Sequence, residues 1–162
     1  MAFTKTIQIG THPDLDALRK SLREDNNVLI GVGAYEIFFE VPIVTTPKTI
    51  KLSIMSIGEL GFRKSAKWSD VTKTVQNHHE YFLCPAEVGL QLRLQYLNQP
   101  IGEKVFVCMN PIESENGSAL IFQLWRDNRQ PILHAEPINY QYQGSWKDWE
   151  FRNEEMLAVA IR

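Results

Sequence analysis

The segment that decides the fold is KVFVCMNPIESENGSALIFQLWRDNRQPILHAE, residues 104–136. It contains three runs rich in apolar, β-branched and aromatic residues, at Lys104–Asn110, Ser118–Arg126 and Pro131–Glu136. Polar stretches separate these runs, and Asn116-Gly117 between the first two supplies residues that accept positive φ, as a hairpin turn requires. The segment therefore predicts three antiparallel strands arranged as a meander.

Helices are expected in the first half of the chain. Leu15, Leu18 and Leu22 recur at spacing i, i+3 and i+7 after two candidate N-cap residues, Thr11 and Asp14, which predicts a helix that ends near residue 25. Ser69 precedes a second apolar stripe, which predicts a helix at Asp70–Phe82. Between these two, Val28–Gly33 predicts a short buried strand, whereas Ala34–Glu40 fits either a helix or a continuing strand.

Three further strands complete the pattern. They are predicted at Thr6–Gly10, at Thr49–Ile57, where apolar side chains alternate, and at Met156–Ile161. A chain that places helices among strands first and a meander last belongs to the α+β class. We expect two or three short helices packed on a mostly antiparallel sheet, in a single domain that covers residues 1–162.

The charge of the chain limits its partners. The 17 basic and 19 acidic side chains give a net charge of −2, so the basic excess that nucleic acid and anionic membranes require is missing. The N-terminus has no apolar stretch of signal-peptide length, and no run reaches about 18 apolar residues. These features predict a cytoplasmic protein whose partner is another protein or a small ligand, with the oligomeric state left open.

Residues 83–100, LCPAEVGLQLRLQYLNQP, concentrate polar groups in an apolar segment. The alternation of leucines after residue 89 fits a strand, and the spacing of Leu90, Leu94 and Leu97 fits a helix. Pro85 suits a first helical turn and favours the helix. A thiol at Cys84 would be activated by a helix N-terminus, but the carboxylate of Glu87 in the same turn would oppose its ionisation.

Arg93 lies between leucines, so we expect it to be partly buried and to need an acceptor. Glu87 is one expected partner, and the acids near Glu113 and Glu115 are another. The arginine either forms a structural ion pair or clamps a carboxylate or phosphate. On the second interpretation Glu87, Arg93 and Tyr96 would form a polar centre that also includes Cys84.

Aromatic residues gather near the C-terminus, at Tyr140, Tyr142, Trp146 and Trp149. Such rings either pin a loop to the sheet or form a recognition surface that stacks on a ligand. The candidate ligand-binding residues are therefore Glu87, Arg93, Tyr96, Trp146 and Trp149. No spacing of cysteine and histidine predicts a metal site, and no glycine-rich motif predicts a cofactor.

Five motifs stand out in order along the chain: Gly58–Phe62, Leu83–Gly89, Leu92–Tyr96, Gln99-Pro100 and Met109–Ile112. Together they resemble the landmarks of a family of small uncharacterised bacterial proteins with a central motif LCPAEVG-x-QLRLQY. That family has no established activity, so the resemblance implies no catalytic residue, cofactor or ligand. Three positions depart from the family pattern: Leu90 replaces a proline, Lys104 a tryptophan, and Asn110 a glutamate.

These observations favour a non-enzymatic binding or interaction protein. Its surface would combine the segment from Cys84 to Pro100 with the aromatic residues near the C-terminus. The alternative is a small hydrolase or transferase whose polar centre holds Glu87, Arg93 and Tyr96. A cleft that joins Glu87 to Arg93 would favour the enzyme, and a flat apolar patch would favour the interaction protein.

Overall fold

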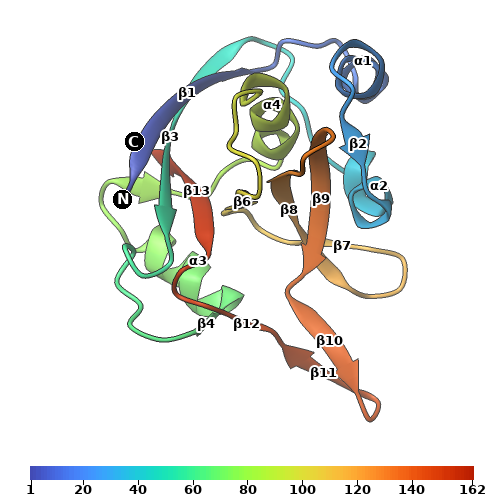
Figure 1. Ribbon diagram of the computed structural model, residues 1–162. Coiled ribbons are helices and arrows are strands. Elements are labelled where there is room, and N and C mark those ends of the chain that lie inside the picture. Colours follow the sequence, from blue (N-terminus) through green and yellow to red (C-terminus); the bar gives the residue numbers. More distant parts are fainter.

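A computed structural model describes residues 1–162 and shows an α+β fold built on one mixed sheet of nine strands (Figure 1). Seven strands form the continuous order β1-β3-β13-β6-β8-β9-β2, while β5 pairs with β13 and β7 pairs with β8. The parallel pairs are β13 with β6 and β2 with β9, so the sheet is mostly antiparallel as predicted. The strands are β1 (Phe3–Ile9), β2 (Leu29–Ile30), β3 (Lys48–Ser56), β5 (Tyr81–Phe82), β6 (Lys104–Val107), β7 (Ile112–Glu113), β8 (Ala119–Arg126), β9 (Pro131–Pro137) and β13 (Met156–Ile161).

Four α-helices and one π-helical turn accompany the sheet, where two or three helices were predicted. They are α1 (Leu15–Lys20), the π-helical turn η1 (Ser21–Asp25), α2 (Val32–Phe38), α3 (Trp68–Gln76) and α4 (Glu87–Gln95). Asp14 caps α1 as predicted, because its side chain accepts a hydrogen bond from the Ala17 N–H at 2.8 Å. No helix is both long enough and apolar enough to cross a lipid bilayer.

Helix α4 lies against one face of the sheet, which we call the inner face. Figure 1 shows it between β1 and β9, and it packs on β1, β8 and β9. A Cβ atom on Gly89 would lie 2.6 Å from Cδ2 of Phe122, so only glycine permits this close approach of α4 to β8. The predicted inner side chains of β3, Ile50, Leu52 and Ile54, are all buried.

The opposite, outer face is covered unevenly. Trp68 at the start of α3 packs on Phe106 of β6 and on Phe151, with ring centroids 6.3 and 5.1 Å apart. Phe151 belongs to the short strand β12 (Glu150–Phe151), which pairs with β4 (Ala66–Lys67). Strands β6, β8 and β9 also present alternate side chains to the outer face.

The aromatic stretch forms a separate hairpin of β10 (Asn139–Tyr142) and β11 (Ser145–Asp148), which projects from the body of the molecule (Figure 1). Positive φ angles at Gln143 and Gly144 form its two-residue turn. The hairpin joins the body at the edge of the outer face, on the side away from α4.

Several predicted elements are corrected by the structure. The predicted helix at residues 70–82 begins at Trp68 and ends at Gln76, and Tyr81–Phe82 pairs with β13 instead. The predicted strand at residues 28–33 is reduced to Leu29–Ile30, and the ambiguous segment after it is the helix α2. The meander β6-β8-β9 forms, but β13 enters beside β6 and joins it to β3.

Candidate functional site

Glu87, the first residue of α4, is buried and bonded to the backbone. One carboxylate oxygen accepts the Gly10 N–H at 2.7 Å, and the other accepts the Val44 N–H at 2.9 Å. Gly10 has φ +72°, and a Cβ there would collide with the carbonyl of Thr46. Glu87 therefore fixes the start of α4 to two loops and forms no ion pair.

Two glutamines continue this stripe of α4 at helical spacing. The carboxamide of Gln91 donates to Glu87 and to the Thr11 hydroxyl, at 3.2 and 2.9 Å. The carboxamide of Gln95 accepts from the Gln8 N–H at 2.9 Å and donates to the Gln8 carbonyl at 2.8 Å, as a neighbouring strand would. Glu87, Gln91 and Gln95 thus attach α4 to β1 and to the loop that follows it.

Arg93 points from another side of α4 and is fully buried. Its guanidinium donates to Gln99 Oε1 at 2.6 Å and to the carbonyls of Tyr96 and Trp125 at 2.7 and 3.2 Å. The predicted ion pair with Glu87, or with an acid near Glu113, is wrong, because all these acceptors are neutral. Burial, with a smaller contribution from the charge of Arg126, lowers the pKa of Arg93 to about 10.

Tyr96 and Cys84 are also enclosed by the fold. The ring of Tyr96 lies 3.9 Å from the ammonium of Lys5, and burial together with the neighbouring Glu103 raises the pKa of Tyr96 above its ordinary value. Burial raises the pKa of Cys84 well above its ordinary value, and the adjacent Cys108 adds to this effect. Cys84 is therefore held as a neutral thiol, and both cysteines are free.

The structure does not bring the predicted polar centre together. Glu87 contacts the loop after β1 and the loop before β3, whereas Arg93 and Tyr96 lie near the ends of β8 and β9. The three side chains hold α4 and the segment that follows it in place, and none of them lines the pocket described next.

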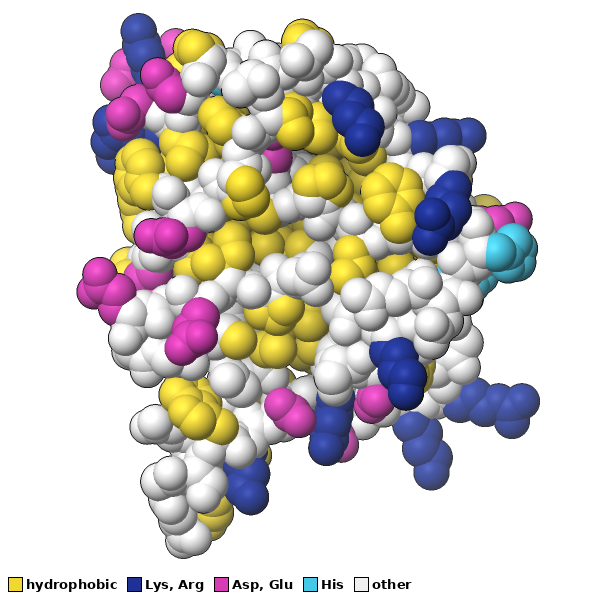
Figure 2. Space-filling view, turned by 180° about the vertical axis from the view of Figure 1, so that it is seen from behind, with side chains coloured by type: hydrophobic (Ala, Val, Ile, Leu, Met, Phe, Trp, Pro, Cys, Tyr) yellow, Lys and Arg dark blue, Asp and Glu magenta, His cyan; other side chains and the backbone are white.

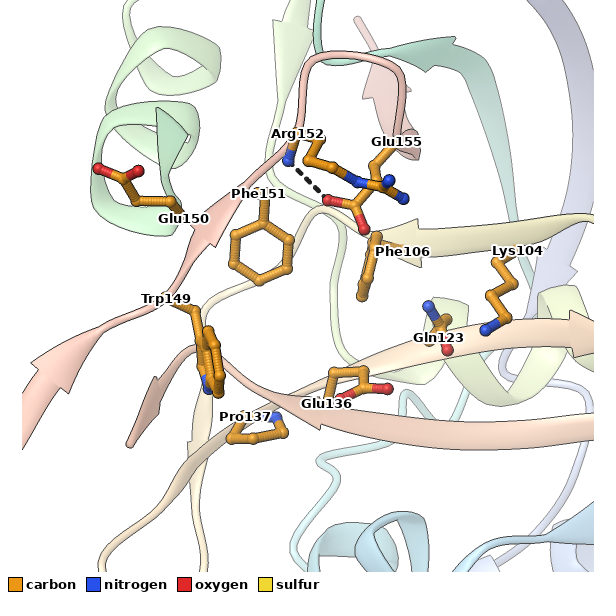
Figure 3. A pocket seen from close by; sticks show the side chains of 10 residues that line it. All are labelled: Lys104, Phe106, Gln123, Glu136, Pro137, Trp149, Glu150, Phe151, Arg152 and Glu155. Atoms are coloured by element: carbon orange, nitrogen blue, oxygen red, sulfur yellow. Dashed lines mark hydrogen bonds between the residues drawn. The ribbon is translucent and has the colours of Figure 1, made fainter. Parts of the chain in front are cut away.

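A pocket of about 320 Å³ lies on the outer face, at the base of the hairpin (Figure 3). This volume falls within the range of roughly 300–1,000 Å³ that is usual for ligand sites. Strands β6, β8 and β9 form one side of it, and the segment from Trp149 to Glu155 forms the other. The lining residues are Lys104, Phe106, Gln123, Glu136, Pro137, Trp149, Glu150, Phe151, Arg152 and Glu155.

Gln123 is the polar residue of this pocket that the fold leaves without a partner. It pairs in register with Phe106 and His134, so its side chain shares the outer face with theirs. Only 4% of Gln123 is exposed, and its carboxamide makes no hydrogen bond within the chain, but its polar atoms are not enclosed. Because these atoms can be reached from the pocket, the residue offers a donor and an acceptor to a bound group.

The charged side chains around the pocket are mostly engaged within the chain. One oxygen of Glu136 lies 3.1 Å from Nε2 of His134, and Glu155 accepts the Arg152 N–H at 2.7 Å. Arg152 pairs with Glu154, and the ammonium of Lys104 lies 4.6 Å from the centre of the Trp125 ring. The second oxygen of Glu136 has no such partner and is open to a ligand.

The two predicted tryptophans occupy different places. Trp149 forms a wall of the pocket, is 46% exposed, and has its ring 4.5 Å from that of Tyr140. Trp146 packs on the β7–β8 turn, where a Cβ on Gly117 would lie 3.1 Å from its ring. Of the five candidate residues, Trp149 is the one that lines this pocket.

One face of the molecule carries many apolar side chains. Figure 2, seen from behind, shows them across the middle of the molecule, with charged side chains mostly toward its margins. The predicted combination of the segment from Cys84 to Pro100 with the aromatic residues would require α4 beside the hairpin. α4 packs on β1, β8 and β9 instead, and the hairpin projects at the opposite end of the molecule (Figure 1).

Sequence reasoning missed Gln123 and Glu136. The available signal was weak: Gln123 interrupts the apolar run from residue 119 to residue 125. No group of three or more His, Cys, Asp or Glu side chains is arranged to hold a metal ion. Comparison with known protein families, curated proteins and solved structures finds no match to the chain, so the family resemblance stays a prediction.

Proposed function

We propose that this chain is a non-enzymatic binding protein whose ligand occupies the pocket beside Trp149. The observation that carries the proposal is Gln123, whose carboxamide has no partner within the chain and lines a pocket of about 320 Å³. A polar ligand in the pocket can satisfy both its donor and its acceptor. The exposed indole of Trp149 adds apolar contact area at the entrance.

The proposal can be tested with a ligand screen read at single residues. A library of small polar molecules and short peptides would be added to ¹⁵N-labelled protein, and the indole N–H signals of the tryptophans would be followed. We expect ligands to shift the signal of Trp149 and to leave that of Trp68 in place, because the Trp68 N–H is buried and donates to the Met109 carbonyl.

Two matched variants complete this test. Trp149→Ala should weaken binding of any ligand found, whereas Trp146→Ala should not, although both side chains are similarly exposed, at 46% and 43%. Both variants should remain folded, since neither indole is buried in the core. A library without any compound that shifts Trp149, or a ligand that binds equally well to Trp149→Ala, would refute the proposal.

A further inference from the structure

The chemistry of the Trp149 pocket also restricts the group that can occupy it. Accepting the binding function proposed above, we infer that the pocket holds the guanidinium group of an arginine presented by a partner polypeptide. The inference depends on three features of the pocket: its carboxylates, its exposed indole and its unpartnered carboxamide.

The charge of the lining favours a cation. Three glutamates line the pocket, Glu136, Glu150 and Glu155, together with the cations Lys104 and Arg152. The carboxylate of Glu150 accepts the Ser65 hydroxyl at 3.1 Å and points away from the pocket in Figure 3, while Arg152 pairs with Glu154 and Lys104 lies over the Trp125 ring. An incoming cation can therefore take the open oxygen of Glu136.

The indole of Trp149 distinguishes a planar cation from a compact one. A guanidinium is flat and weakly hydrated, so it stacks on an aromatic face while its N–H groups bond in its own plane. In the view of Figure 3 the carboxylate of Glu136 lies between Trp149 and Gln123. A guanidinium on the indole can therefore direct N–H groups toward Glu136 and toward the carboxamide oxygen beyond it.

The carboxamide of Gln123 indicates that the arginine belongs to a polypeptide. Its oxygen accepts one guanidinium N–H, and its NH₂ group is then left to donate to a carbonyl. A guanidinium has no acceptor, but the backbone of the segment that carries the arginine supplies one. A purine nucleotide could also stack on Trp149 and pair with Gln123, yet its phosphates would approach the carboxylates of Glu136 and Glu155.

The test uses three terminally blocked tripeptides: acetyl-Gly-Arg-Gly-amide and its counterparts with citrulline and with lysine. Each would be titrated into the ¹⁵N-labelled full chain, with the Trp149 indole N–H and the Gln123 side-chain amide as readouts. We expect the arginine peptide to shift both signals in a saturable manner. Citrulline has nearly the same shape without the charge, so its affinity should be lower by about tenfold.

Variants of the pocket check the assigned contacts. Glu136→Gln removes the charge with little change of shape and should weaken the arginine peptide on the order of tenfold. Gln123→Leu should also weaken it and should keep the fold, because an apolar side chain of similar size suits a buried position. Glu36→Gln removes the same charge from an exposed site on α2 and should have no effect.

The outcomes separate this inference from the proposed function. Equal binding of the citrulline peptide, or binding of adenosine monophosphate in place of the arginine peptide, would overturn the arginine assignment and leave the pocket as a ligand site. The same holds if a library compound shifts Trp149 and no tripeptide does. If neither the tripeptides nor the library shift Trp149, the inference and the proposed function both fail.

Discussion

At the scale of single residues, Glu87 shows how a carboxylate can stabilise a fold without a counter-ion. Its two oxygens accept N–H groups from Gly10 and Val44, which belong to different loops. Hydrogen bonds to a charged acceptor are stronger than those between neutral groups, so the burial of this charge is offset by well-placed donors. Glu87 therefore holds the start of α4 against these two loops.

This role predicts the effect of Glu87→Gln. Glutamine has the same shape but one acceptor oxygen, so either the Gly10 N–H or the Val44 N–H would face an NH₂ group and stay unsatisfied. We expect the free energy of unfolding to fall by about 1–3 kcal/mol, measured by urea denaturation. The control Glu40→Gln changes an exposed glutamate and should cost less than about 0.5 kcal/mol. Equal costs for the two variants would contradict the assigned role.

The buried thiols predict how stability depends on alkaline pH. Burial raises the pKa of Cys84 well above its ordinary value and that of Cys108 to about 12, whereas both thiols ionise near pH 8.5 in the unfolded chain. A raised folded pKa gives stability that is present below the unfolded pKa and is lost as pH rises toward the folded pKa. Stability should therefore fall above about pH 8.5, by up to about 1.4 kcal/mol per thiol and pH unit.

Arg93 acts in the opposite direction, but at higher pH. Its pKa is lowered to about 10, so its charge opposes folding below that value and this cost is relieved only above pH 10. The window from pH 8.5 to 10 therefore reports chiefly on the cysteines. Urea denaturation of the double variant Cys84→Ala, Cys108→Ala should show a flatter dependence in this window, and an unchanged slope would refute the assignment.

At the scale of elements, α4 combines a polar stripe with a close backbone contact. The side chains of Glu87, Gln91 and Gln95 hold it to β1, and Gly89 brings it against Phe122 of β8. The helix is thereby buried along nearly its whole length, including its charged residues. Its sequence has no simple amphipathic pattern for this reason, which explains why residues 86–97 fitted both a helix and a strand.

The close contact predicts that Gly89→Ala destabilises the protein, although alanine favours helices. The new methyl group would overlap the Phe122 ring, at a cost of about 1–3 kcal/mol, which exceeds the gain of about 0.5–1 kcal/mol from helix propensity. Thermal or urea unfolding measures the balance. The second variant Phe122→Leu should recover part of the loss in the Gly89→Ala background, and a stabilising Gly89→Ala would refute the close contact.

The elements also show what the sequence could and could not predict. The helix after Asp14 follows a local pattern of capping and apolar spacing, β3 follows alternation, and β8 and β13 are apolar runs; the structure confirms all four. The end of α3 was misplaced because the helical spacing of apolar residues continues to Phe82, which is drawn into the sheet by pairing with Ala160. Such pairing depends on residues far along the chain, so no local pattern reveals it.

The same limitation applies to the pocket. Its residues come from β6, β8, β9 and the segment after the hairpin, and they meet only because β13 returns beside β6. By contrast, most of the functional groups that are dense in the sequence, from Cys84 to Tyr96, turn out to be buried, and only the carboxamide residue Gln95 is exposed. The polar residues of this segment attach α4 to the rest of the fold instead of forming a ligand site.

At the scale of the whole molecule, the two faces of the sheet differ in what covers them. The inner face is closed by α4, while the outer face carries the pocket. The last strand makes this division possible. β13 pairs with β3 on one side and with β6 on the other, so it joins the N-terminal strands to the meander.

This topology predicts that the sheet cannot close until the end of the chain is present. The side chains of residues 157–160 are all fully buried, so deletion of residues 156–162 would remove the centre of the sheet and separate its two halves. We expect the truncated chain to lose its cooperative thermal transition and to bind the dye ANS, as loosely packed chains do.

A control deletion in the hairpin tests whether the loss of the cooperative transition depends on which segment is removed and not on how many residues are removed. Replacing residues 141–146 by Gly-Gly leaves Tyr140 and Lys147 as a cross-strand pair closed by a two-residue turn. Because β11 is exposed along its length, this variant should keep a cooperative transition. A chain without β13 that unfolds cooperatively and with similar stability would contradict this topology. In that case β1 and β3 would not need β13 to join the meander, and β13 could not lie between them.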